Sequence, residues 1–78
     1  MATEITVDIK ERLGVLKTNE LGWTKELNIV SWNGGPYKYD IREWSPDHER
    51  MSRGITLTAS EMDAIVESYG HHKGNFAE

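Results

Sequence analysis

The sequence predicts an α+β fold in which a four-stranded antiparallel sheet is followed by one C-terminal helix, all in a single domain of 78 residues. Three observations predict it. Apolar and polar residues alternate in short segments before residue 58, as they do in strands with one buried face. The Asn-Gly-Gly-Pro stretch at 33–36 is typical of a hairpin. From Met62 onward, apolar residues recur with helical spacing.

The first two strands are predicted at residues 5–18 and 24–33. Apolar residues alternate along the first of them as far as position 15, with a possible bulge near Glu11. The polar stretch 18–22 forms the turn between the two strands. The second strand places its odd-numbered apolar residues on one face of the sheet and Trp32 on the opposite face.

The third strand spans 37–44, and its register depends on the length of the hairpin loop. A two-residue loop, 34–35, would set Ile29 opposite Asp40 and mix buried with solvated positions. A three-residue loop, 33–35, sets Ile29 opposite Tyr39, and we predict this register because it keeps apolar residues on one face. On the opposite face it gathers Trp32, Lys38 and Arg42, with Arg42 across from Glu26.

The last elements follow a polar loop at 45–53. Residues 54–58 predict a short fourth strand, with Ile55 and Leu57 facing inward, and a Thr-x-x-Glu capping box at 58–61 predicts the start of the helix. The apolar stripe of the helix consists of Met62, Ile65, Val66 and Tyr69. Gly70 is expected to end the helix, and the tail 70–78 is expected to be flexible. We expect the helix to cover one sheet face, and a second copy of the chain to bury the apolar surface that remains.

The composition excludes several classes of protein. The chain has no cysteine, so it has neither disulfides nor thiolate metal sites, and it has no apolar run long enough to span a membrane. No signal peptide is evident, and we expect a cytoplasmic protein. The net charge is −4, but residues 10–53 hold eight Lys/Arg and seven Asp/Glu, a local net charge of +1. A basic surface in the middle of the chain is therefore compatible with an acidic total.

The run YKYDIREW, a polar loop and then RGITLTASEMDAI resembles the core motif of the positive-cofactor-four transcriptional coactivators, and the whole chain is similar to their bacterial YdbC branch. The resemblance covers about residues 11–69. It implies a curved sheet, a homodimer formed through the helices, and single-stranded DNA binding along the sheet without catalysis. Val30 stands where the family often has a basic residue, and the loop at 45–53 is acidic where the family's is rich in Lys and Gly. We therefore expect the affinity to be lower, or to rely more on stacking, than in the eukaryotic members.

Trp32 and Trp44 are the residues on which the functional prediction depends. Tryptophan is commonly buried, but strand parity places both on the Arg42 face, and we expect them to be exposed for base stacking. The resemblance assigns binding roles to Trp32, Arg42, Trp44, Arg50 and Arg53. Further candidates for contact with nucleic acid are Lys10, Arg12, Lys25, Asn28, Tyr37 and Lys38.

We therefore expect a homodimer that binds single-stranded DNA with little sequence preference and supports transcription, replication or repair. Single-stranded RNA is a possible ligand. The alternative is a protein-interaction module that docks a protein partner, from the transcription or replication machinery, on its open sheet face, which the net acidity favours. No motif for a nucleophile, a phosphate-binding loop or a dinucleotide is present, so we expect neither an enzyme nor a cofactor. His48, between two acidic residues of a loop, is not expected to bind a metal.

Overall fold

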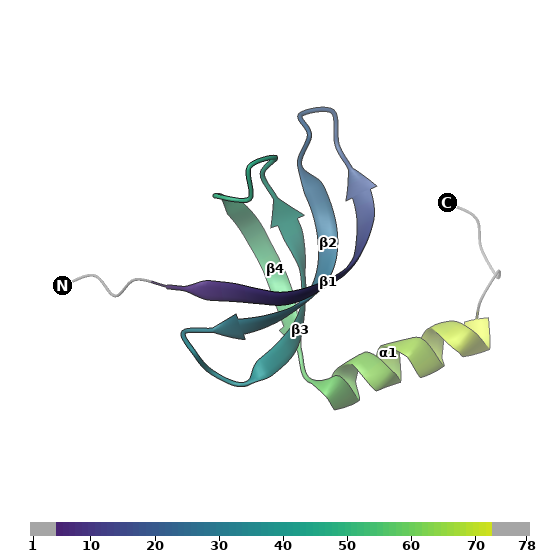
Figure 1. The fold of residues 1–78 in the computed structure, drawn as a ribbon. Helices are drawn as coiled ribbons and strands as arrows, with labels where there is room; N and C mark the ends of the chain where they lie inside the picture. Colours follow the sequence, from purple (N-terminus) through teal and green to yellow (C-terminus); the bar gives the residue numbers. More distant parts are fainter. Residues whose placement is uncertain (1–4, 73–78) are drawn as a thin grey trace.

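The computed structural model describes residues 5–72. Over this range the chain forms one antiparallel sheet whose strands follow each other in sequence order, β1-β2-β3-β4, with a helix after the last strand (Figure 1). The elements are β1 (Val7–Thr18), β2 (Thr24–Trp32), β3 (Tyr37–Trp44), β4 (Met51–Leu57) and α1 (Ala59–His72). The predicted fold class is confirmed. The fourth strand begins at Met51, three residues earlier than predicted.

The β2–β3 hairpin has the predicted register, although its strands end at Trp32 and begin again at Tyr37, so residues 33–36 lie between them. Asn33 and Gly34 have φ values of 50° and 74°, in the left-handed region that Asn and Gly tolerate best. The Gly35 N–H donates to the Trp32 carbonyl at 2.8 Å. Ile29 consequently lies opposite Tyr39, which confirms the predicted register.

Strand β1 is less regular than the sequence indicated. Its pairing with β2 shifts at three places, between Ile9 and Glu11, between Arg12 and Gly14, and between Val15 and Lys17. We predicted one bulge near Glu11. The other two break the alternation that was expected to continue to Val15, because each bulge moves the residues after it to the opposite face.

The two faces of the sheet differ in a way that hydrophobicity alone would not predict. The inner face carries the even-numbered residues of β2 and β3, and it buries three polar side chains, Glu26, Asn28 and Asp40. The outer face carries the odd-numbered residues, and its apolar members differ in exposure. Leu27, Ile29, Tyr39 and Ile41 are partly buried, whereas Ile55 of β4 is 54% exposed. Leu57 pairs with Tyr39 on the same face and is buried as predicted.

Helix α1 begins with the predicted capping box, but it does not cover the sheet. The Thr58 hydroxyl accepts from the Glu61 N–H at 3.2 Å, and the Glu61 carboxylate accepts from the Thr58 N–H at 2.8 Å. The helix then continues through Gly70 to His72, so residues 70–72 of the predicted tail are helical, and residues 73–78 of that tail lie outside the described residues.

Every residue of α1 lies within the described range, and none of them is buried. Figure 1 shows the helix leaving the end of β4 and running away from the sheet. The expectation that it covers a sheet face is therefore wrong for the single chain. Only Thr58 separates β4 from α1, so there is no loop in which the chain could turn back. Met62, at the start of the apolar stripe, is partly buried, but Val66 and Tyr69 are 58% and 61% exposed, so most of the stripe has no cover within the described chain.

Candidate nucleic-acid interface

Arg42 and Trp32 form a stacked pair on the inner face. The pair joins β3 to β2, and the guanidinium carbon of Arg42 lies 4.7 Å from the centroid of the Trp32 ring. Both side chains are partly exposed. A guanidinium over an indole is a cation–π contact, and together the two groups offer flat surfaces on which a planar ring can stack.

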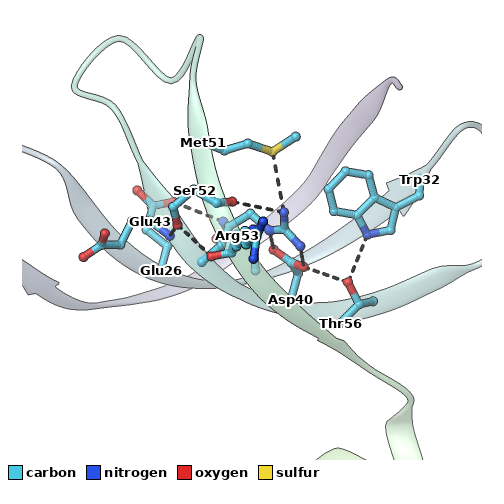
Figure 2. A network of polar contacts seen from close by, with 10 residues as sticks. Glu26, Trp32, Asp40, Glu43, Met51, Ser52, Arg53 and Thr56 are labelled. Carbon is cyan, nitrogen blue, oxygen red and sulfur yellow. Dashed lines mark hydrogen bonds and ion pairs between the residues drawn. The ribbon is translucent and has the colours of Figure 1, made fainter. Parts of the chain in front are cut away.

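Asp40 holds this pair in place. Its carboxylate is fully buried and accepts from Arg42 Nε at 2.6 Å and from Arg42 Nη2 at 2.8 Å (Figure 2). It also accepts from the Thr56 hydroxyl at 2.9 Å, and Thr56 in turn accepts from Trp32 Nε1 at 3.3 Å. The orientations of the indole and of the guanidinium are thus fixed by one buried carboxylate, which also neutralises the charge of Arg42.

Gly54 makes room for Arg42 on the neighbouring strand. It pairs with Arg42 across the sheet, and a Cβ at this position would lie 2.3 Å from Arg42 Cβ. Beside it, Arg42 Nη1 donates to the Ser52 carbonyl at 3.3 Å and lies 3.9 Å from the Met51 sulfur. Any larger residue at position 54 would therefore displace the arginine or the strand.

Lys38 and Arg12 are exposed cations that share the inner face with the Trp32–Arg42 pair. The side chain of Lys38 lies on this face because its partner on β2 is Val30, and Arg12 of β1 pairs with Asn28. The predicted grouping of Trp32, Lys38 and Arg42 is confirmed as a structural fact. Their contact with nucleic acid stays a prediction.

Four other candidates lie on the outer face. Lys25 pairs with Glu43, and Lys25 and Arg53 line one shallow hollow beside Ile41. At the hairpin end of the same face, the Lys10 ammonium lies 5.3 Å from the centroid of the Tyr37 ring. The Tyr37 side chain, and then the charge of Asp8, raise the pKa of Lys10, so this lysine stays charged.

Arg50 lies apart from both groups, in the β3–β4 loop, with its guanidinium 5.8 Å from the centroid of the Trp23 ring. The candidate residues are thus divided between two faces and a loop, and they do not form one continuous surface on the single chain.

Two candidates are not accessible. Trp44 lies on the predicted face but is only 3% exposed, and the His48 ring stacks on it with 5.7 Å between centroids. Asn28 is 0% exposed, and its amide donates to Glu26 at 3.1 Å. The expected exposure of Trp44, and a direct contact of Asn28 with a base, are therefore wrong for this conformation.

Glu26 is the second buried carboxylate of the inner face. Burial by itself would raise its pKa, but hydrogen bonds from Thr24, Asn28 and His48, with the charge of His48, lower it overall. The His48 Nε2 atom lies 2.8 Å from a Glu26 oxygen. Glu26 is therefore ionised at neutral pH and ties the β3–β4 loop to β2.

Reasoning from sequence missed the supporting residues Asp40, Thr56, Glu26 and His48. Asp40 could have been found, because it stands two positions before Arg42 and so shares its face. Thr56 required the β3–β4 register, and His48 required the path of an irregular loop.

Within residues 5–72, the structure brings no three His, Asp or Glu side chains together as metal ligands. None of the helices it describes is long and apolar enough to cross a membrane.

The comparison with protein families decides the family of the chain. The model of the family described as Transcriptional Coactivator p15 (PC4) matches residues 19–68, which is well over half of the sequence. The chain belongs to the PC4 family. PC4 proteins are non-enzymatic coactivators associated with single-stranded DNA binding. The matched segment contains the Trp32–Arg42 pair and Asp40.

A relative of this PC4-family chain occurs in Treponema pallidum (strain Nichols). It is 48% identical over 58 residues, which cover 74% of this chain and 68% of the relative. That protein is itself described only as uncharacterized. The relative therefore adds no information on the activity of this chain.

Proposed function

We propose that this PC4-family chain binds single-stranded DNA with little sequence preference, through the inner face of the sheet, and so assists transcription, replication or repair. The observation that carries the proposal is the Trp32–Arg42 pair, held by Asp40. A base in single-stranded DNA has free faces and can stack on such a pair, whereas a duplex hides its base faces. The cytoplasm remains the predicted compartment.

The charges of the inner face indicate that stacking contributes more to binding than phosphate contacts do. Asp40 already neutralises Arg42, so Lys38 and Arg12 are the exposed cations beside the Trp32–Arg42 pair. Two or three neutralised phosphates per protomer give a slope of log affinity against log salt of about −1.4 to −2.1 for single strands. Such a slope is shallow for a nucleic-acid-binding protein.

We further propose that the working form is a homodimer. Ile65, Val66 and Tyr69 of α1 and Ile55 on the outer face of the sheet are exposed in the single chain. The buried hydrophobic core within residues 5–72 is limited to Val30, Trp44 and Leu57. A chain of this size needs more buried apolar surface than that. A second copy offers the matching surfaces.

A fluorescence anisotropy titration with a labelled oligothymidine tests the binding proposal. We expect the single strand to bind more tightly than a duplex of the same length. Trp32→Ala should weaken binding about 5- to 150-fold, which corresponds to the loss of one stacked base, about 1–3 kcal/mol. Trp23→Ala, in the β1–β2 turn, is the matched control. Equal affinity for duplex and single strand, or an unchanged affinity of Trp32→Ala, would contradict the proposal.

Sedimentation equilibrium tests the dimer. Val66→Asp places a charge on the apolar stripe of α1, where a monomer would tolerate it because Val66 is 58% exposed. We expect this variant to dissociate at concentrations at which Ser68→Asp, on the opposite side of the helix, remains dimeric. A wild-type chain that sediments as a monomer would refute the dimer.

A second candidate function is the docking of a protein partner on the outer face. The partly exposed apolar residues of that face and the net charge of −4 favour it. A pull-down after nuclease treatment separates the two functions, because a partner that binds directly is retained and one bridged by nucleic acid is lost. Loss of all partners would exclude the docking function.

A further inference from the structure

The β3–β4 loop, residues 45–50, is a compact unit held by its own hydrogen bonds. The Ser45 hydroxyl donates to Asp47 at 2.6 Å and accepts from the Arg50 N–H at 3.0 Å, while the Ser45 N–H donates to the Arg50 carbonyl at 2.9 Å. These bonds join the two ends of the loop. The loop therefore has a defined shape of its own between β3 and β4.

His48, at the tip of this loop, connects it to the inner face. Its Nε2 atom lies 2.8 Å from the Glu26 carboxylate on β2, a residue 22 positions away in the sequence. Its ring lies nearly parallel to the Trp44 indole, with an interplanar angle of 20°. The His48 ring thus covers one face of the Trp44 indole, which is only 3% exposed.

The closed loop contains two unfavourable features at the same place. His48 has a φ of 59°, a left-handed conformation that is strained for a residue other than glycine. The Trp44 Nε1–H is buried and has no hydrogen-bond partner among the described residues. An unpaired buried donor is destabilising. Opening of the loop would give the Trp44 Nε1–H access to water, and it would break the two His48 contacts and the contact of Arg50 with the Trp23 ring.

We propose that the 45–50 loop is a lid over a second base-stacking site at Trp44, and that single-stranded DNA binds there when His48 swings out. This inference rests on the proposed DNA binding. Trp44 is two residues beyond Arg42 on the same strand face, about 7 Å further along β3. A strand stacked on the Trp32–Arg42 pair therefore passes Trp44 with its neighbouring nucleotides.

His48→Asn is the decisive variant. Asparagine tolerates the left-handed backbone, so the turn is retained, but the side chain is too short to stack on Trp44 or to hold Glu26. We expect the Trp44 indole N–H to exchange faster with water by ¹⁵N NMR than in the wild type. We also expect oligothymidine to bind about 3- to 10-fold more tightly, because apparent affinity scales with the fraction of molecules already open. His71→Asn, which removes a histidine of α1, is the control.

The outcomes separate this inference from the proposed function. Perturbation of both the Trp32 and the Trp44 indole signals by the oligonucleotide, with tighter binding of His48→Asn, supports the lid. Perturbation of Trp32 alone, with His48→Asn binding like the wild type or more weakly, overturns the lid and leaves the DNA binding in place. A wild-type protein that does not bind the oligonucleotide refutes the function and the lid together.

Discussion

Replacement of Asp40 by asparagine tests whether one buried carboxylate organises the inner face. Asp40 is 0% exposed and accepts three hydrogen bonds, two from Arg42 and one from Thr56. Asparagine has the same size, but it carries no charge and turns a donor toward one of the Arg42 nitrogens. The variant thus leaves a guanidinium without its counter-ion on a mostly buried surface.

The expected loss of stability is large for a domain of this size. Removing one partner of a buried ion pair lowers the free energy of unfolding by about 3–5 kcal/mol. The Arg42 side chain is 12% exposed and can reach water, so we expect about 3 kcal/mol. At about 4–8 °C per kcal/mol, the midpoint of thermal unfolding should fall by about 12–24 °C.

A double-mutant cycle followed by circular dichroism identifies the cause. Asp40→Asn, Arg42→Met and the double variant are melted at one protein concentration, because an oligomer unfolds in a concentration-dependent way. The two single variants each lose free energy of unfolding, and independent effects would add up in the double variant. If the loss in Asp40→Asn comes from the unpaired guanidinium, the double variant should be about 1–3 kcal/mol more stable than this sum predicts. A coupling close to zero, or a loss below about 1 kcal/mol for Asp40→Asn, would refute this reasoning.

Three further substitutions have defined expectations. Gly54→Ala should destabilise the fold strongly and weaken DNA binding, because the new Cβ would lie 2.3 Å from Arg42 Cβ. Gly14→Ala is the control, since position 14 has open space around it, and in a thermal scan it should melt within a few degrees of the wild type. Glu26→Gln tests the lowered pKa of Glu26. The stability that this carboxylate contributes is fully present above its ordinary pKa of 4.5 and is lost as the pH falls through the lower pKa of the folded state. In urea unfolding, the wild type should therefore lose its advantage over the variant only below pH 4.5. Thr58→Ala removes the helix cap and should cost about 1 kcal/mol in urea unfolding; an unchanged midpoint would show that the cap does not contribute.

The strand register was predictable because the hairpin loop and the apolar pattern constrain it together. Only a three-residue loop keeps Ile29 and Tyr39 on one face, and this fixed the positions of Trp32, Lys38 and Arg42 relative to one another. The capping box predicted the start of α1 equally well, since it depends on residues close together in sequence.

The burial of Trp44 and the direction of α1 could not be predicted in the same way. Strand parity gives the face on which a side chain lies, but the exposure of that face depends on the path of the 45–50 loop, whose His48 contacts Glu26 across 22 positions of sequence. Gly70 was expected to end the helix. It stands inside α1, since glycine lowers helix stability without forbidding the conformation.

The bulges of β1 affect how the molecule behaves in concentrated solution. This strand is an edge of the sheet, and an exposed edge of 12 residues would ordinarily recruit strands from other molecules and seed aggregates. Three interruptions in its pairing indicate that its outward N–H and C=O groups do not form one regular row. A strand from another molecule could therefore form backbone hydrogen bonds with β1 over short stretches only. This limits the growth of the protein into fibres.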